Sequence, residues 1–311
     1  MRILYSDRPD HVPPCVATIG FFDGVHRGHQ YLLQQVRHIA GQEQLLSAVV
    51  TFDVHPRQVV KADYRPELLT PLDCKLALLE ATGIDLCWVL RFDAQMAAMS
   101  AREFMAQVLA RQMHVGCLVV GYDHHFGHDP HASFDDYVRW GGEAGIRVVH
   151  ADELDVADAS VSSSRIRRAL RQGDVVEADR CLGRPYALTG TVVGGEQQGR
   201  KMGFPTANLS LVEPCQLVPA SGVYEVVAQI DDKPAVYTAM MNIGTRPTFH
   251  GDHLTLEVHI LQFDGNLYGH RLTVAFRRRL REERPFDSPE ALARQLRQDI
   301  NSIEHPSSQK L

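Results

Sequence analysis

The first 180 residues alternate short apolar runs with segments of helical periodicity. The strand-like runs cover residues 15–20, 45–52, 85–90, 117–121 and 146–150, and helical spacing is found over 30–40, 73–82, 100–111 and 134–144. Strands that alternate with helices predict right-handed crossovers and an α/β fold with a doubly wound parallel sheet. Ligands of such sheets lie beyond the carboxyl ends of the strands. Polar residues that follow the strands are therefore the first candidates for a site.

From about Gly183 the pattern changes to short β-rich runs punctuated by Gly and Pro. These runs cover residues 186–193, 222–230, 235–243, 254–263 and 271–276, a spacing typical of a small barrel. Ser288-Pro289-Glu290 then predicts the start of a final helix. We therefore predict two domains, 1–182 and 183–305, followed by a tail at 306–311.

Composition narrows the function classes. The chain has 311 residues, 44% hydrophobic and 23% charged, as expected for a globular protein. A formal net charge of −6 argues against a general nucleic-acid-binding surface. There is no apolar run of membrane-spanning length and no export signal at the N-terminus. Six scattered cysteines without a CxxC pair predict reduced thiols, and we expect a cytoplasmic protein.

The segment after the first predicted strand reads Gly20-Phe21-Phe22-Asp23-Gly24-Val25-His26-Arg27-Gly28-His29. This pattern predicts His26 and His29 on the first helical turn, three positions apart, where unpaired N–H groups and the helix dipole favour anions. Gly24 and Gly28 would let a phosphate or base approach the backbone closely. A lone His-x-x-His pair usually indicates metal binding or nothing, but its place in a Gly-rich strand-to-helix turn favours a nucleotide site.

A second polar element is Ser162-Ser163-Ser164-Arg165-Ile166-Arg167. Ser162 or Ser163 is predicted to cap a helix, with free hydroxyl and N–H groups facing an anion. Arg167 would add a bidentate phosphate contact. Taken alone, the same residues also fit an ordinary capped helix with solvated arginines.

Together these two elements resemble the HxGH nucleotidyltransferase superfamily. More closely, they resemble the adenylyltransferase half of the bacterial bifunctional riboflavin kinase/FMN adenylyltransferase (FAD synthetase) family. Segments 51–56 (TFDVHP) and 121–127 (GYDHHFG) are similar to further motifs of that family, with Val54 where proline is usual and His124 and His125 where Phe and Arg are usual. Residues 128–132 (HDPHA) also replace a basic, Gly-containing stretch.

The resemblance implies direct transfer, in which the FMN phosphate attacks the α-phosphorus of ATP and pyrophosphate leaves. It assigns His26 and His29 to the stabilisation of the transition state. Asp123 and Phe126 are assigned to the flavin. The residues that it places near ATP are Gly20, Phe21, Asp23, Gly24, Gly28, Ser163, Ser164 and Arg167.

The second half contains a Gly-rich stretch at 194–199 with the glycine spacing of a P-loop, but Arg200-Lys201-Met202 replaces the required Lys-[Ser/Thr]. We interpret the stretch as a flap, followed by Pro205-Thr206-Ala207-Asn208. Thr206 and Asn208 alternate to one side of an extended segment, and both carry hard oxygen ligands suitable for Mg²⁺. An exposed β-turn is the alternative interpretation.

Segments 205–208 (PTAN), 221–224 (SGVY), 242–249 (NIGTRPTF), 257–260 (EVHI) and 267–269 (LYG) resemble a riboflavin kinase, in the same order. The resemblance implies a six-stranded barrel and transfer of the ATP γ-phosphate to the ribityl 5′-hydroxyl. It makes Glu257 the general base, places Gly199, Thr206 and Asn208 near ATP and Mg²⁺, and places Asn242 and Arg281 near the flavin. Without these neighbours, Glu257 would fit an ordinary solvent-facing strand position.

The leading hypothesis is a bifunctional enzyme that converts riboflavin to FMN and FMN to FAD. ATP is the co-substrate of both steps, with Mg²⁺ as the cofactor. We expect small-molecule partners only, with no nucleic acid and no membrane, and a monomer or weak homo-oligomer. One alternative is an active kinase with a weakened adenylyltransferase, given His124, His125 and Ala132. Another is a flavin-sensing or RNA-binding regulator, which would not need Glu257.

Overall fold

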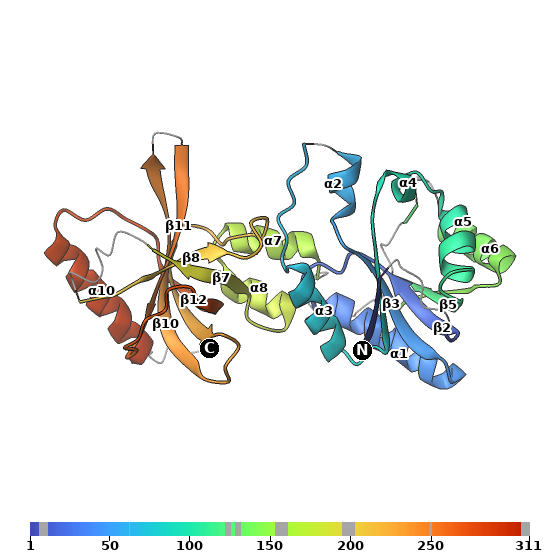
Figure 1. The fold of residues 1–311 in the computed structure, drawn as a ribbon, viewed down its shortest axis with the longest axis horizontal. Helices are drawn as coiled ribbons and strands as arrows, with labels where there is room; N and C mark the ends of the chain where they lie inside the picture. Colours follow the sequence, from blue (N-terminus) through green and yellow to red (C-terminus); the bar gives the residue numbers. More distant parts are fainter. Residues whose placement is uncertain are drawn as a thin grey trace. The chain divides into compact units, whose positions relative to one another are not determined.

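The computed structural model describes residues 1–5, 12–61, 63–121, 126–127, 132–152, 161–194, 203–248 and 251–305 (Figure 1). The chain divides into two compact units, Met1–Ser163 and Ser164–Leu311. Two helices, α7 (Ser163–Arg171) and α8 (Val175–Leu182), precede the strands of the second unit. The domain boundary expected after residue 182 stays a prediction.

The first unit contains a sheet of six parallel strands in the order β1-β4-β3-β2-β5-β6. The strands are β1 (Arg2–Tyr5), β2 (Cys15–Ile19), β3 (Leu46–Phe52), β4 (Leu86–Leu90), β5 (Val115–Val120) and β6 (Arg147–His150). The chain runs outward from β2 to β4 and then returns to β5 on the other side of β2. This reversal of strand order, where such sheets bind ligands, confirms the doubly wound sheet.

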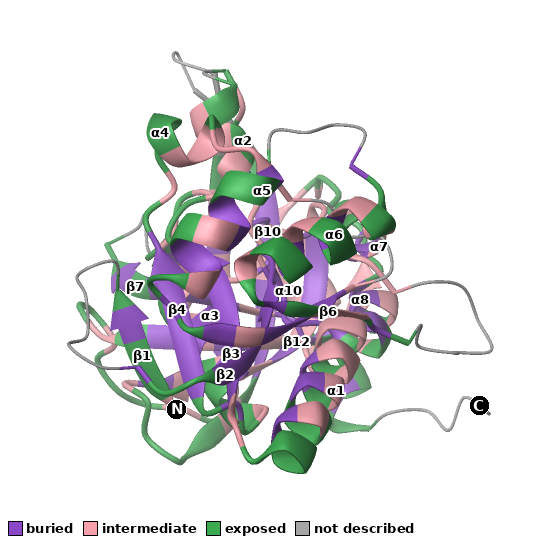
Figure 2. Ribbon diagram, turned by 90° about the vertical axis from the view of Figure 1, so that its right-hand side faces the viewer, coloured by how far each residue is buried: buried purple, intermediate pink, exposed green. Residues whose placement is uncertain are grey.

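Helices cover both faces of this sheet (Figure 1). One face packs against α1 (Arg27–Glu43) and α3 (Leu72–Ala81), and the other against α5 (Ala101–Phe104), η1 (Met105–Ala110) and α6 (Phe134–Ala144). The four central strands, β2 to β5, are buried between these layers, whereas the helices turn exposed faces outward (Figure 2). Because successive strand residues point to opposite faces, alternate residues belong to two separate apolar clusters. Two short helices, α2 (Pro56–Val60) and α4 (Ala94–Ala97), follow β3 and β4.

Two features of the first unit differ from the sequence prediction. Strand β1 was not expected, because its four residues carry too little pattern, but it pairs in parallel with β4 at the edge of the sheet. The single helix expected over 100–111 consists of α5 and the wider turns of η1. Its start was predicted correctly: the Ser100 hydroxyl accepts from the Glu103 amide at 3.2 Å, and the Glu103 carboxylate accepts from the Ser100 amide at 2.9 Å.

The second unit contains a closed barrel in the order β10-β11-β8-β7-β12-β9, in which all pairs are antiparallel. Its strands are β7 (Ala187–Val193), β8 (Ala207–Leu211), β9 (Gly222–Ile230), β10 (Val236–Thr248), β11 (Gly251–Ile260) and β12 (Arg271–Arg281). The predicted six-stranded barrel is confirmed. Strand β12 continues past the expected end at residue 276, because two register shifts keep it paired with β9.

The predicted C-terminal helix is α10 (Pro289–Glu304). The Ser288 hydroxyl accepts from the Ala291 amide at 3.2 Å and so caps its start. Val223 and Met240 of the barrel pack against Leu296, Ile300 and Ile303 of the helix. This contact places α10 beside the outer face of β9 and β10, next to a cavity described below.

Candidate active sites in the two units

The turn that joins β2 to α1, residues 20–26, is held in an unusual backbone conformation. Phe22, Gly24 and Val25 have φ values of 55°, 82° and 38°. The left-handed region favours glycine, so for a phenylalanine and a β-branched valine it costs on the order of 1–3 kcal/mol each. Such conformations persist only where the surrounding structure holds them, and they cluster at functional sites.

Asp23 anchors this turn to the segment that precedes α3. Its carboxylate is 4% exposed and accepts hydrogen bonds from the amide of Leu69 at 2.9 and 3.0 Å and from that of Thr70 at 3.1 Å. The Thr70 hydroxyl in turn accepts from the Gly24 amide at 3.1 Å. These contacts fix the turn, and the assignment of Asp23 to ATP stays a prediction.

Lys75 of α3 belongs to the same region and was missed by the sequence analysis. Its side chain is buried, and its Nζ atom donates to the carbonyls of Phe21 and Phe52 and to the Thr51 hydroxyl, each at 3.1 Å. Burial lowers the pKa of this lysine to about 8. The one available signal was a lysine in a helix that is otherwise apolar on its inward face.

The two histidines of the turn lie together, as predicted. His26 is the N-cap of α1, and its Nδ1 accepts from the His29 amide at 3.3 Å. Their rings stack with centroids 3.5 Å apart and planes 17° apart. A Cβ atom at Gly28 would lie 3.3 Å from the Nδ1 atom of His26, so glycine permits the close packing. The expectation that His26 lies within the first helical turn is corrected: it precedes the helix.

The serine-rich segment reaches this turn at its first helical residue. The Ser163 hydroxyl donates to the carbonyl of Asp23 at 3.0 Å. Ser164 and Arg167 follow on α7, where Arg165 pairs with Glu177 of α8 at 2.7 Å. Ser163 therefore meets the β2–α1 turn, and its assignment to ATP stays a prediction.

Of the remaining predicted residues of the first unit, Gly20 directly follows β2, and its amide donates to the Val50 carbonyl at 3.0 Å. Phe126 stacks on Tyr137 of α6 with centroids 4.6 Å apart, and its amide donates to the Tyr137 hydroxyl at 3.2 Å. This aromatic pair adjoins the apolar cluster on the α5–α6 face of the sheet. Asp123 of the first unit, and Gly199 of the second, lie outside the described residues.

In the barrel, the register aligns three polar residues across adjacent strands. Glu257 of β11 pairs with Asn242 of β10 on one side and with Asn208 of β8 on the other. Directly opposite residues of antiparallel strands extend to the same face. One carboxylate is thus flanked by two amides, an arrangement that the sequence spacing could not show.

A cavity of about 540 Å³ opens on this face. Four of the predicted residues line it: Glu257, Asn242, Thr206 and Arg281. Residues 283–289 and the start of α10 close its other side. Its volume is typical of a site for a drug-sized organic ligand.

Arg281 is held at the wall of this cavity by α10. Its Nε donates to the Asp299 carboxylate at 2.9 Å, and the other oxygen of that carboxylate accepts from Gln295 at 2.9 Å. The guanidinium also lies 5.6 Å from the ring centroid of Phe286. The charge of Arg281 is therefore fixed in place through a buried partner.

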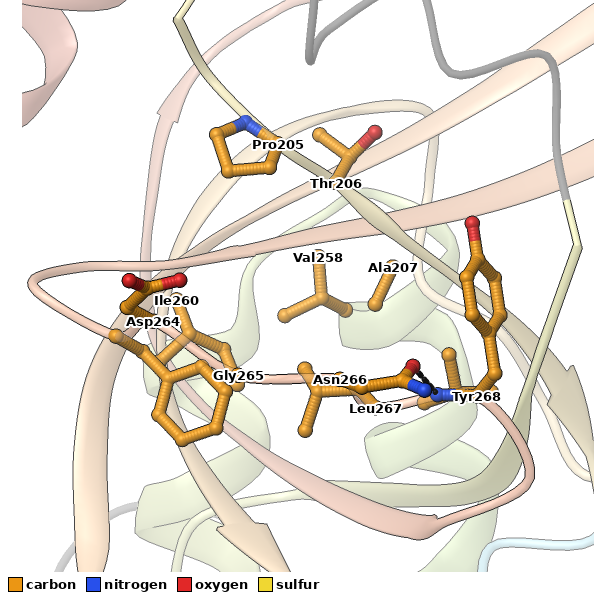
Figure 3. A pocket seen from close by; sticks show the side chains of 12 residues that line it. Pro205, Thr206, Ala207, Val258, Ile260, Asp264, Gly265, Asn266, Leu267 and Tyr268 are labelled. Carbon is orange, nitrogen blue, oxygen red and sulfur yellow. Dashed lines mark hydrogen bonds between the residues drawn. The ribbon is translucent and has the colours of Figure 1, made fainter.

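A second cavity, of about 520 Å³, lies at the other side of Thr206. Figure 3 shows Pro205 and Thr206 along one side and the loop from Asp264 to Tyr268 along the other. The loop is braced by the Asn266 side chain, which accepts from the Tyr268 amide at 3.1 Å. Because Thr206 lines both cavities, a ligand in one can meet a ligand in the other at this residue.

Two further cavity residues were not identified from the sequence. A Cβ atom at Gly244 would clash with the carboxylate of Glu283, so this glycine lets Glu283 lie against β10. His259 is positioned by a 2.8 Å contact between its Nδ1 and the carbonyl of Pro205. Gly244 and His259 lie within segments 242–249 and 257–260, but their contacts with Glu283 and Pro205 depend on the barrel register and on loop conformation.

Across the residues that the structure describes, no group of three or more His, Cys, Asp or Glu side chains could hold a metal ion. None of the helices in these ranges combines the length and apolar character needed to cross a membrane.

Comparisons with known proteins match both units. A family model described as FAD synthetase matches residues 8–165, and one described as riboflavin kinase matches residues 182–306. A solved structure from Streptococcus pneumoniae, titled macrolide-efflux protein, has a TM-score of 0.89 and 30% sequence identity, and covers 99% of this chain and 100% of that chain.

Curated relatives carry the same pair of activities in their names. A bifunctional riboflavin kinase/FMN adenylyltransferase from Pseudomonas fluorescens is 40% identical over 96% of this chain and 95% of its own length. Relatives of the same name from Listeria monocytogenes and Escherichia coli are each 37% identical, over 91% and 92% of this chain and 90% of their own lengths. The two matches in order, and similarity over nearly the whole length, place this chain in the bifunctional riboflavin kinase/FMN adenylyltransferase family.

Proposed function

We propose that this chain makes FAD in two steps. Its barrel transfers the γ-phosphate of ATP to the 5′-hydroxyl of riboflavin, which gives FMN and ADP. Its parallel-sheet unit joins FMN to the adenylyl group of a second ATP and releases pyrophosphate. The observation that carries the proposal is Glu257, whose carboxylate lines an organic-ligand-sized cavity that meets a second cavity at Thr206.

In the kinase step, we assign riboflavin to the cavity of Glu257 and ATP to the cavity of the Asp264–Tyr268 loop. Glu257 would accept the hydroxyl proton as the O–P bond forms, while the bond from the γ-phosphorus to the β-phosphate oxygen breaks. Asn208 and Asn242 are the cross-strand neighbours of Glu257 in the barrel. Arg281, held by Asp299, places a positive charge at the wall of the flavin cavity.

Two residues of segment 206–208 carry donors that suit Mg²⁺, and one of them, Thr206, lines both cavities. Thr206 carries a hydroxyl and Asn208 an amide oxygen, and both are hard oxygen ligands that a magnesium ion accepts. Bound there with ATP, the ion would neutralise charge on the phosphate groups. The backbone around Thr206 is positioned by the contact between Pro205 and His259.

In the adenylyl step, the N-terminus of α1 supplies the positive end of a helix dipole beside the stacked pair His26 and His29. The FMN phosphate would attack the α-phosphorus, and pyrophosphate would leave. The protein contributes positioning and charge neutralisation rather than a covalent intermediate. Ser163, Ser164 and Arg167 are assigned to the leaving phosphates.

Incubation with riboflavin, ATP and Mg²⁺, followed by chromatography of the flavins over time, tests the proposal. We expect FMN to appear first and FAD to follow. FMN that accumulates without FAD would favour the alternative of a weakened adenylyltransferase, which the departures at His124, His125 and Ala132 suggest. Unchanged riboflavin would contradict the proposal.

We further propose functional domains at 1–182 and 183–305, and a cytoplasmic protein that is a monomer or weak homo-oligomer. The family models support the division, since one ends at residue 165 and the next begins at residue 182. Light scattering at micromolar concentration measures the oligomeric state.

A further inference from the structure

The ammonium group of Lys75 is buried behind the β2–α1 turn and makes three hydrogen bonds. Its side chain extends from α3 to the carboxyl ends of β2 and β3, where the residue is only 2% exposed. A charged lysine has three N–H donors, and Nζ has three acceptors at 3.1 Å, the carbonyls of Phe21 and Phe52 and the hydroxyl of Thr51. The site therefore matches the protonated form of the side chain.

The titratable groups that face Lys75 lie on three neighbouring elements. Asp23 of the β2–α1 turn and Asp53 after β3 favour the ammonium form, and Cys87 of β4 is the third titratable neighbour. Burial raises the pKa of the Cys87 thiol to about 12, so it is neutral in ordinary buffers. Two carboxylates thus remain as charged neighbours. Burial outweighs them and lowers the pKa of Lys75 to about 8.

Burial of an ammonium group costs desolvation free energy that an apolar side chain would not cost. Replacement of buried charges by apolar side chains of similar volume is often neutral or stabilising. A charge that is kept in spite of its desolvation cost, with a shifted pKa, is a candidate for a functional role. The contacts of Lys75 with Phe21 show where that role lies.

Phe21 begins the strained turn that leads to His26 and His29. The Nζ atom of Lys75 bonds the Phe21 carbonyl and also lies 4.2 Å from the centroid of its ring. The Phe21 ring also contacts the His55 ring, with centroids 4.7 Å apart. Asp23, two residues later, is tied to the segment just before α3. The turn is thus held at Phe21 by Lys75 and at Asp23 by backbone amides.

We propose that Lys75 is a positioning residue for adenylyl transfer, whose cation fixes the Phe21 and Phe52 carbonyls and so holds the β2–α1 turn in the geometry that the histidines require. This inference rests on the proposed adenylyltransferase function. It assigns the residue a role without contact to a substrate. Loss of the proton removes the positive charge and leaves Nζ with two N–H donors instead of three.

The test compares both activities of the whole chain in the wild type and in Lys75→Met, with the exposed Lys61→Met as the matched control. FAD formation from supplied FMN and ATP, and FMN formation from riboflavin and ATP, are measured from pH 6.5 to 9.5. At pH 7 we expect Lys75→Met to lower kcat for FAD formation at least tenfold, with a smaller change in KM. FMN formation should stay within twofold in both variants.

The pH profile separates positioning from a merely structural role. Wild-type FAD formation, relative to FMN formation, should fall as pH rises through about 8, and Lys75→Met should lack this inflection. FAD formation within twofold of wild type in Lys75→Met, or the same inflection in that variant, would overturn the inference. If Lys75→Met does not fold, the pH profile of the wild type tests the inference by itself. A ratio of FAD formation to FMN formation that does not change with pH would then contradict the role of Lys75. Wild-type protein that makes FMN but no FAD at any pH instead contradicts the proposed function and this inference with it.

Discussion

Glu257 of β11 lies directly opposite Asn208 of β8 in the closed barrel. Asn242 of β10 occupies the equivalent position on the other side of Glu257. The three side chains extend to one face because paired residues of antiparallel strands share a face. A carboxylate between two amides, at the wall of a cavity, is suited to accept a proton from a bound hydroxyl.

The first prediction concerns this carboxylate. We expect Glu257→Gln to lower FMN formation by about 10²–10⁴-fold, the usual contribution of a general base, while FAD formation from supplied FMN persists. Chromatographic assays of each step in the same preparation measure this. The matched control is Glu282→Gln, since Glu282 is 85% exposed and does not line the cavity. Parallel loss of both activities in Glu257→Gln would contradict separate sites.

The second prediction concerns the magnesium site. Thr206→Val removes a hydroxyl at nearly constant volume, so we expect FMN formation to need a higher Mg²⁺ concentration and to fall at least tenfold at low Mg²⁺. Titration of kinase activity with Mg²⁺ measures the shift. Thr255→Val, which changes another threonine of the same cavity, is the control. A Mg²⁺ dependence that matches the wild type would remove Thr206 from the site.

The third prediction separates capping from chemistry at the histidine pair. His29→Ala should lower FAD formation by at least 10²-fold and leave FMN formation unchanged, because it removes an imidazole that we propose stabilises the transition state of adenylyl transfer. His26→Asn keeps an N-cap side chain, so it should fold like the wild type while FAD formation falls. Circular dichroism and the FAD assay together check this. Full activity in His26→Asn would show that His26 serves only as a cap.

The fourth prediction concerns Asp23 as the anchor of the β2–α1 turn. Asp23→Asn would direct an amide N–H₂ or a single oxygen at the amides of Leu69 and Thr70. Loss of buried hydrogen bonds of this kind costs about 1–3 kcal/mol. We expect that destabilisation in urea unfolding, together with reduced FAD formation. Asp63→Asn, an exposed aspartate of the same unit, should change neither.

The fifth prediction follows from the pKa of Lys75, lowered by burial from 10.5 to about 8. Between these values the unfolded chain binds more protons than the folded chain, so this residue makes stability rise with pH. Relative to Lys75→Met, wild-type unfolding free energy should rise by roughly 3 kcal/mol as pH increases from 7 to 10.5. The raised pKa of Cys15 affects both proteins alike, and the Cys87 thiol, whose pKa burial raises to about 12, stays protonated in both folded proteins over this range. A difference that is constant with pH, measured by urea unfolding, would contradict the buried charge.

Much of the fold was predictable because local patterns and tertiary packing agree. Helix α6 spans 134–144 as its periodicity and its Ser133 cap indicate, and β2, β3 and β4 match the predicted apolar runs to within one or two residues. These segments bury one face or both, and the spacing of apolar residues along the sequence predicts which faces are buried. By contrast, β1 carries almost no pattern of its own and exists through its pairing with β4.

The sequence by itself determined which residues were candidates. The Gly-rich turn with His26 and His29, the serine-rich helix start and the motif around Thr206 are contiguous in the chain, so local pattern and family resemblance together identified them. Only the tertiary structure decided which distant residues support them. Lys75 meets Phe21 from 54 residues away, and Glu257 stands between Asn208 and Asn242 through barrel register. Such contacts depend on strand pairing and burial. These form only when distant segments of the chain pack together, so the local sequence pattern does not predict them.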